Sequence, residues 1–468
     1  IQDVVGNIAA SSTVSAGISN DTITFQKVTN AYVDEGAQLT SGRNIIIKAI
    51  SDEAYVVVVV SAGAAAGATP TGAVNGAVST IIIKNETTAE VKANTADTIL
   101  TTNGSIAIWA EDNQNLYVIA GSANAAINAT GVSVSGAAGV AVVKASNTVQ
   151  ALVGKLAQLD AYGTTGITFY TGELDGNDGD RKRNRKKATQ YGVLIGAFNT
   201  NNLMAITASG SAGTGAAGSI ASTTVVSDTV VRAKVEQGAQ INQKVKANRE
   251  QKTSASSVKV IAMDSTEADT AAGGAAVGIA GATGTIVVTY LKKTVEAILN
   301  GMVYAPGGVD VLAVSDNNAF LASASLGAGL AGGAGSVSVL NIENTVHSAP
   351  GGVIKAAGAV LAEALNRQYI TTGALAAAGG SVAAGGAVAT ILFKSQTTAE
   401  VLDGAQITAA SLAVNAQSGE TITGTVAAAA AGSGAASGSL VLIIADSKTK
   451  ALTGNNVTII LSGDLNVV

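Results

Sequence analysis

The twelve residues TTAEVLDGAQIT (397–408) recur in pieces along the whole chain. The first five letters, TTAEV, occur again at 87–91. The second part returns as AYVDEGAQLT at 31–40 and as RAKVEQGAQIN at 232–242. Self-similarity at long spacing is the sequence signature of repeat architectures, in which each unit packs on the next. We therefore interpret the phrase as a piece of architecture before considering any chemistry.

Charge is distributed with the same regularity. Long stretches rich in Ala, Gly, Ser and Thr contain no acidic or basic residue, and each is followed within a few residues by a charged residue and a phrase such as NTVQA (147–151) or KTVEA (293–297). The uncharged stretches are 54–83, 113–143, 188–227, 270–291, 317–342, 368–393 and 421–445. This alternation indicates a unit that repeats from one end of the chain to the other.

A second marker, five residues long, alternates strictly between apolar and variable positions, as in IIIKA (45–49) and VKVIA (258–262). Its variable positions include Lys48, Trp109, Lys259, Asp310, Glu363 and Asn415. A period of two is typical of a strand with one buried and one exposed face. The markers start at Ile45, Ile106, Val193, Val258, Val309, Val360, Leu412 and Val457, and they step by 61, 87, 65, 51, 51, 52 and 45 residues. The basic unit is therefore near 51 residues, and the 87-residue step contains an insertion.

Two other architectures fit the pattern less well. Helical repeats of this length conflict with markers made of Val, Ile and Thr, and with Gly in every apolar stretch, which costs a helix about 1 kcal/mol per Gly relative to Ala. Membrane helices need about 20 apolar residues. The uncharged stretches are long enough, but their Ser, Thr and Asn would need partners in the hydrocarbon, and Leu and Phe are scarce. We therefore expect no transmembrane helix.

The pattern predicts an all-β fold, a parallel β-solenoid that forms one continuous domain over 1–468, with about eight units of about 51 residues. We expect each unit to form about two coils, with coils hydrogen-bonded at about 4.8 Å. Stacking explains the repetition, because a residue that suits one coil suits its neighbours. The glycine shared by DEGAQ, EQGAQ and LDGAQ (Gly36, Gly238 and Gly404) is expected at a corner of the coil. A positive φ is needed there, and glycine is the residue that adopts it without a steric penalty.

Composition excludes several function classes. There is no cysteine, which removes thiol catalysis, thiolate metal sites and disulfides together. The net charge of −5 gives no general reason to expect a nucleic acid as partner. Gly reaches 55 of 468 residues while aromatic residues are 3%, so the core must be built from small side chains. The chain starts at Ile1 without a signal-peptide pattern, and we expect it to be an internal piece of a longer protein.

Strands in strict alternation, x-x-G-A-x-[IL]-T corners and long Ala/Gly/Ser stretches with T-x-A-x-V phrases resemble the large filamentous exoproteins of bacteria. The similarity is to leukotoxin-like filamentous adhesins and to filamentous-haemagglutinin-like proteins exported by two-partner secretion. It covers nearly the whole chain as a repeat style, although the N-terminal secretion domain of that family is not visible here. The resemblance implies a right-handed parallel β-helix, an extracellular or cell-surface location, and adhesion or cytotoxicity. It supplies no catalytic residues.

Candidate catalytic residues are few. His347 is the only histidine, and it lies in a repeat phrase whose equivalents hold Gln150, Arg232 or Glu400, so we expect an exposed strand position. One histidine and no cysteine leave no basis for a zinc site, and no Gly-rich run is followed by the GK[ST] of a phosphate loop. Lys259, Asp310 and Glu363 are expected on one outer face, but other markers do not continue their chemistry. We expect no enzyme activity, no cofactor and no metal.

The segment GELDGNDGDRKRNRKKATQYG (172–192) is the charged insertion that interrupts the repeats. Its acidic part resembles a calcium loop, but Asp180 stands where that loop needs Gly and no Glu closes it. The basic run consists of Arg181, Lys182, Arg183, Arg185, Lys186 and Lys187. A charge block of this kind is usually a solvated loop. The functional alternative is a patch that binds anionic glycans or phosphate-rich surfaces electrostatically.

The sequence favours a structural or adhesive segment of a bacterial cell-surface or secreted filamentous protein. Two alternatives stay open: a segment of a leukotoxin-type exoprotein, and a self-polymerising extracellular fibre subunit. Its partners would be host or neighbouring-cell surface components, or other copies of the chain associating end to end or laterally, because the open ends of a solenoid expose unpaired strand edges. Dye leakage from target cells would separate the toxin from the adhesin.

Overall fold

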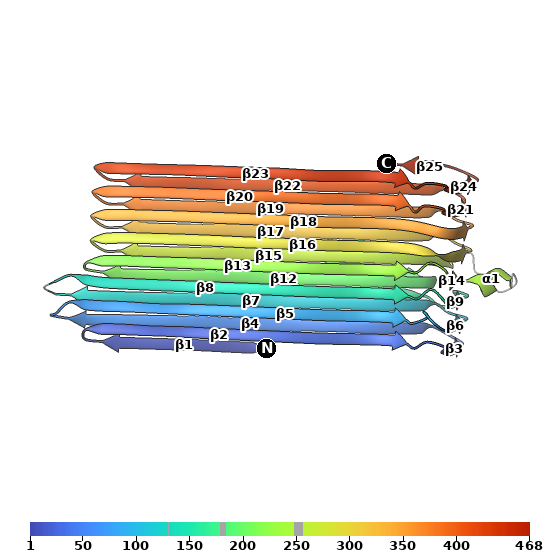
Figure 1. The fold of residues 1–468 in the computed structure, drawn as a ribbon, viewed down its shortest axis with the longest axis horizontal. Helices are drawn as coiled ribbons and strands as arrows, with labels where there is room; N and C mark the ends of the chain where they lie inside the picture. The colour runs from blue at the N-terminus through green and yellow to red at the C-terminus, as the bar shows by residue number, and fades with distance from the viewer. Residues whose placement is uncertain (130, 178–183, 248–255) are drawn as a thin grey trace.

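The computed structural model describes residues 1–129, 131–177, 184–247 and 256–468, and its described part is a parallel β-solenoid made of two long facing sheets (Figure 1). Sheet A has nine strands and sheet B has fourteen. The expected all-β parallel solenoid of repeated units is confirmed. A strand of sheet A runs to a turn at one end of the molecule, called the distal end here, and the chain returns along sheet B to the corners at the proximal end.

The strand bounds follow a regular plan. Sheet A contains β1 (Gln2–Ser11), β4 (Ile45–Gly67), β7 (Ile106–Asn128), β12 (Gly192–Gly213), β15 (Ser257–Val277), β17 (Val309–Ala328), β19 (Val360–Gly379), β22 (Leu412–Ala431) and β25 (Leu465–Val467). The long strands of sheet B are β2 (Val14–Val33), β5 (Thr71–Val91), β8 (Ser133–Val153), β13 (Ala216–Val235), β16 (Ala280–Ala305), β18 (Ala331–Ala356), β20 (Val382–Val401) and β23 (Gly434–Thr453). Its short strands at the proximal end are β3 (Gln38–Ser41), β6 (Thr98–Thr102), β9 (Ala157–Ala161), β14 (Gln240–Ile241), β21 (Gln406–Ala409) and β24 (Thr458–Leu461).

Each repeat unit makes one coil of the solenoid, and the expectation of about two coils per unit is wrong. Strand β4 leads through a distal turn to β5, then through a corner to the short β6, and the chain re-enters sheet A as β7 directly beside β4. The reason is the length of the strands, since those of one coil run for 20 residues or more. An uncharged stretch therefore forms the distal half of one long coil and not a coil of its own.

The register confirms the marker strands with one exception. Ile45 pairs with Ile106, and the series continues in register through Val193, Val258, Val309, Val360 and Leu412. Leu412 then pairs with Leu465, not with the expected Val457. The segment after Val457 is β24, which pairs with β21 at the proximal end. The last marker is thus wrong because a corner strand alternates in the same way as a strand of sheet A.

The phrase TTAEVLDGAQIT (397–408) is the end of a long strand followed by a corner. Thr397–Val401 ends β20, and Gly404 leads into the short β21. The three corner glycines have the expected positive φ, with values of 77° for Gly36, 100° for Gly238 and 71° for Gly404. Only glycine adopts this conformation without a steric penalty. The corner prediction is confirmed.

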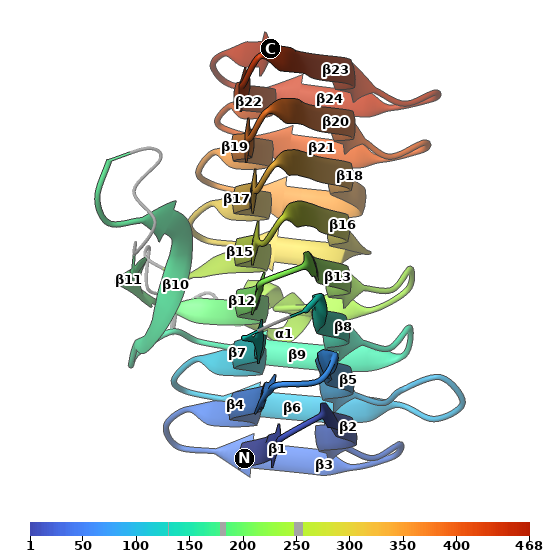
Figure 2. The same cartoon turned by 90° about the vertical axis from the view of Figure 1, so that its left-hand side faces the viewer.

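Two excursions leave the coil at the proximal end of sheet A and sheet B. Strands β10 (Ile167–Leu174) and β11 (Arg185–Gln190) form an antiparallel hairpin that stands outside sheet A (Figure 2). The short helix α1 (Gln243–Ala247) follows β14 before the chain returns to β15. The hairpin is the predicted insertion, and the second excursion accounts for the long step between Val193 and Val258 that the spacing left unexplained.

Candidate functional site

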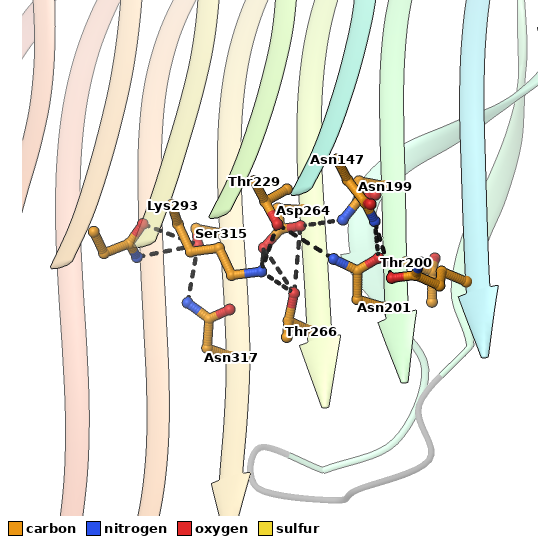
Figure 3. Close-up of polar contacts among 12 residues, drawn as sticks. Asn147, Asn199, Thr200, Asn201, Thr229, Asp264, Thr266, Lys293, Ser315 and Asn317 are labelled. Carbon is orange, nitrogen blue, oxygen red and sulfur yellow. Dashed lines mark hydrogen bonds and ion pairs between the residues drawn. The ribbon is translucent and has the colours of Figure 1, made fainter. Parts of the chain in front are cut away.

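The interior of the solenoid is not uniformly apolar, because a seam of polar side chains crosses it from coil to coil (Figure 3). On sheet A the stacked seam positions hold Ser51, Asp112, Asn199, Asp264, Ser315 and Asn366. On sheet B they hold Asn85, Asn147, Thr229, Lys293, Asn344 and Ser395. One large apolar cluster lies on the proximal side of this polar seam, and two smaller clusters lie on its distal side.

Hydrogen bonds across the two sheets satisfy much of the seam. Asn147 Nδ2 donates to Asn201 Oδ1 at 2.6 Å, and Asn344 Nδ2 donates to Asn366 Oδ1 at 2.6 Å. Within sheet A, Asn199 Nδ2 donates to Asp264 Oδ1 of the next coil, also at 2.6 Å. A buried polar group costs free energy unless it is hydrogen-bonded, so these contacts fix how the sheets face each other. The polar seam therefore helps to fix the register of the two sheets and makes the solenoid more rigid.

Lys293 and Asp264 form an ion pair inside the seam. Their side chains are both 0% exposed, and Lys293 Nζ lies 3.5 Å from Asp264 Oδ2. Lys293 Nζ also donates to Thr266 Oγ1 at 2.5 Å and to Thr229 Oγ1 at 3.0 Å (Figure 3). Burial lowers the pKa of Lys293 from its ordinary value, while the Asp264 carboxylate opposes that change. The ammonium thus has three polar partners that replace water.

A second charged group in the seam lies near the N-terminal coils. Glu53 accepts hydrogen bonds from Lys27 Nζ and Asn85 Nδ2, each at 2.7 Å, and from the hydroxyl of Ser51. Asp112 sits in the next coil and is fully buried. Burial, followed by the charge of Glu53, raises the pKa of Asp112 to about 8. Asp112 therefore carries a proton at neutral pH.

Asp112 makes the stability of the chain depend on pH. The unfolded chain releases this proton near pH 4 and the folded chain near pH 8, so the free energy of unfolding falls as the pH rises between these values. We expect Asp112→Asn to remove that fall and to raise the free energy of unfolding at pH 8 by several kcal/mol. Urea unfolding at pH 5 and pH 8 measures it. Asp52→Asn, on the exposed face of β4, is the control, and an equal change in both variants would contradict the assignment.

The hairpin is anchored to the outer face of sheet A by an aromatic and aliphatic cluster. Phe198 is 0% exposed, and its ring centroid lies 4.7 Å from that of Trp109 and 5.1 Å from that of Tyr170. Ile167, Phe169 and Leu174 contribute from the hairpin. Trp109 Nε1 donates to Glu111 at 3.0 Å, and so does the Tyr170 hydroxyl. The insertion is thus packed against the outer face of sheet A, and Trp109 is part of the contact.

The basic run of the insertion is divided by this packing. Arg181, Lys182 and Arg183 lie outside the described residues. Arg185 turns inward: its guanidinium lies 5.1 Å from the Tyr170 ring centroid and 5.9 Å from that of Phe198, and it donates to the Thr200 hydroxyl. Lys186 is exposed and pairs with Glu173 at 3.2 Å, while Lys187 is exposed and lies 5.3 Å from the Tyr170 ring. Arg185 thus serves the anchor, and Lys186 and Lys187 are available at the surface.

A groove of about 410 Å³ opens beside the hairpin on the outer face of sheet A. Asn184 and Leu174 line it from the hairpin side, and Thr200, Asn202 and Met204 line it from β12. The carboxylates at its wall are Glu267, Asp269 and Asp316. Arg367 Nε lies 3.1 Å from Asp316 Oδ2. These groups can donate and accept hydrogen bonds to a polar molecule in the groove.

The other residues singled out by the sequence lie in two places, with Lys259, Asp310 and Glu363 on sheet A and His347 on sheet B. Lys259 forms an ion pair with Asp310 on the outer face of sheet A, and burial, with the Asp310 charge second, raises the pKa of Glu363 nearby. The expectation of one shared outer face is confirmed. His347 lies on the outer face of sheet B, half-buried, with Nε2 2.9 Å from Glu400 Oε1.

The strand register corrects one of the expected equivalents of His347. The residue that pairs with His347 on β20 is Thr398, so Glu400 is its ion partner and not its equivalent. Gln150 and Arg232 do stack in the same column as His347.

The polar seam and the role of Arg185 were not predicted. The signal for the seam was present, because Asn or Lys stands at the start of the phrases NTVQA, KTVEA and NTVHS, two residues before a buried Val. Comparison with protein families, with curated proteins and with solved structures finds no match to this chain. Among the described residues, no helix is long and apolar enough to span a membrane.

Proposed function

We propose that the chain is a structural and adhesive segment of a bacterial cell-surface or secreted filament, in which the solenoid is a stiff support and the hairpin is a surface feature that it presents. The observation that carries this proposal is the continuous register. Every long strand of sheet A pairs in parallel with the next one from β1 to β22. A stack of this kind extends by adding coils, which is what a filament requires.

Bead adhesion tests the proposal against the toxin alternative. Beads coated with the chain are incubated with host-cell monolayers, and dye release from the same cells is recorded. We expect the coated beads to adhere above albumin-coated beads, with no dye release. Dye release by the free chain without adhesion would contradict the proposal and support the cytotoxic alternative.

Lys186 and Lys187 favour an anionic surface component as the adhesive ligand, because both are exposed on the outward hairpin. We expect a variant with both lysines replaced by Ser to elute from heparin at lower salt than the unchanged chain, since the attraction is electrostatic. Arg185 is kept because it packs in the anchor. The matched control replaces Lys292 and Lys394 of sheet B with Ser, and equal effects of the two pairs would exclude a specific role for the hairpin.

A further inference from the structure

The outer face of sheet B is apolar where each long strand leaves the distal turn. In its eight long strands, all of which the structure describes, the outward side chains of the first nine residues carry no charge. The large aliphatic side chains exposed there include Val74, Val134, Ile220, Ile286, Val382 and Leu440. These outward residues are called the distal face of sheet B below. A contiguous exposed apolar surface of this extent marks an interaction site.

A row of charged side chains bounds the distal face. Lys84, Asp228, Lys292, Glu343, Lys394 and Asp446 stand in one column of the register, interrupted by Ser146. The signs alternate from β13 to β23, and the row holds three positive and three negative groups. Two copies of the face brought together would therefore not repel each other through these rows.

The surface of the distal face is hollowed along the solenoid axis. Two shallow depressions of about 540 and 580 Å³ meet at Gly218 and Ala282. The aliphatic side chains of Val134 and Val382 border the first of them, and those of Val74 and Ile220 border the second. Raised aliphatic side chains beside a shallow depression give a surface that can receive a second surface of the same shape.

The area of the distal face suffices for a stable contact. Nine residues of a strand span about 30 Å, and eight strands span about 38 Å in the hydrogen-bonding direction. The product is roughly 1,100 Å² on each copy, which exceeds the roughly 800 Å² per partner of a standard interface. No other part of the described chain covers this face, because the hairpin stands on the side of sheet A (Figure 2).

We propose that the distal face of sheet B is the contact surface for a second copy of this chain, with the two solenoids packed face to face. This inference rests on the proposed filament function and adds to it the surface through which the solenoids associate laterally. A second copy fits better than lipid, because Gly and Ala contribute little apolar area for transfer into hydrocarbon.

Glycines on the two faces give a matched test. Gly284 and Gly335 lie at the centre of the distal face, and a Cβ built on either meets no atom within 4 Å. Gly273 and Gly379 have the same free space in sheet A. Lysine therefore fits at all four positions of one copy. Only the pair in sheet B would place a charge and a long side chain between two distal faces.

Sedimentation equilibrium of the 468-residue chain from 1 to 100 µM measures the association. We expect a dimer for the unchanged chain, a dimer for Gly273→Lys/Gly379→Lys, and at least a 100-fold higher dissociation constant for Gly284→Lys/Gly335→Lys. Circular dichroism checks that both variants fold. If Gly284→Lys/Gly335→Lys does not fold, Ile220→Lys replaces it, because the Ile220 side chain is 56% exposed.

The inference would be overturned by a monomer at 100 µM, by equal effects of the two glycine pairs, or by flotation of the monomer with vesicles of phosphatidylcholine and phosphatidylglycerol at 3:1. Growth into long polymers that the sheet B variant does not alter would show end-to-end contact instead and would likewise reject the face. Cell adhesion by a monomer would leave the filament function supported while this inference fails, so the two failures are distinguishable.

Discussion

Replacing Lys293 with methionine is expected to lower the free energy of unfolding of the surrounding coils by about 3–5 kcal/mol. Methionine keeps most of the length of the side chain but removes the ammonium group. Asp264, whose side chain is 0% exposed, would then be a buried carboxylate without its cation. Breaking one half of a buried pair costs more than the pair contributes, because the remaining charge is left without water. Urea unfolding followed by circular dichroism measures the change.

The neighbouring coil supplies the control for this prediction. There the two seam positions hold Ser315 and Asn344, and Asn344 Nδ2 donates to Ser315 Oγ at 3.1 Å. The double variant Asp264→Ser/Lys293→Asn copies that neutral pair into the charged coil. We expect it to stay within about 1 kcal/mol of the unchanged chain, since no charge is left unpaired. A double variant as unstable as Lys293→Met would show that packing, and not the unpaired charge, causes the loss.

The fold could be predicted because its periods are local and repeated. Alternation in markers such as IIIKA and VKVIA gives the strand, and the return of Gly36, Gly238 and Gly404 gives the corner. The number of coils per unit could not be predicted in the same way. Alternation continues unbroken along a strand of 20 residues, so nothing local tells one long strand from two short ones. Val457 was misplaced because the corner strand β24 alternates in the same way as a strand of sheet A.

The polar seam and the hairpin anchor were not predicted, because charged residues were assumed to lie on the exposed face. A charged residue in an alternating strand is normally placed on the exposed face. Lys293 is an exception, because the first, third and fifth residues of its phrase KTVEA point inward, in register with those of NTVHS. Arg185 is the other exception, since it follows a dense basic run that reads as a solvated loop but packs against Tyr170 and Phe198. Both become visible only when the partners from distant coils are known.

The hairpin anchor leads to the second large effect. Phe198→Ala is expected to lower the free energy of docking of the hairpin by about 3–5 kcal/mol, because the ring is 0% exposed and packs against both Trp109 and Tyr170. The chain contains a single tryptophan, so its fluorescence reports on this cluster alone. We expect the emission of Trp109 to shift to longer wavelength as water enters, and cleavage between β10 and β11 by trypsin to become faster.

Phe320→Ala is the matched control, because Phe320 lies on the same outer face of sheet A in β17 and is 38% exposed. Its loss removes little buried area, and we expect a change below about 1 kcal/mol with unchanged Trp109 emission. If Phe198→Ala left the emission unchanged as well, the hairpin would not depend on this cluster. The position of Lys186 and Lys187 would then follow from other contacts of β11 and not from the packing of Phe198.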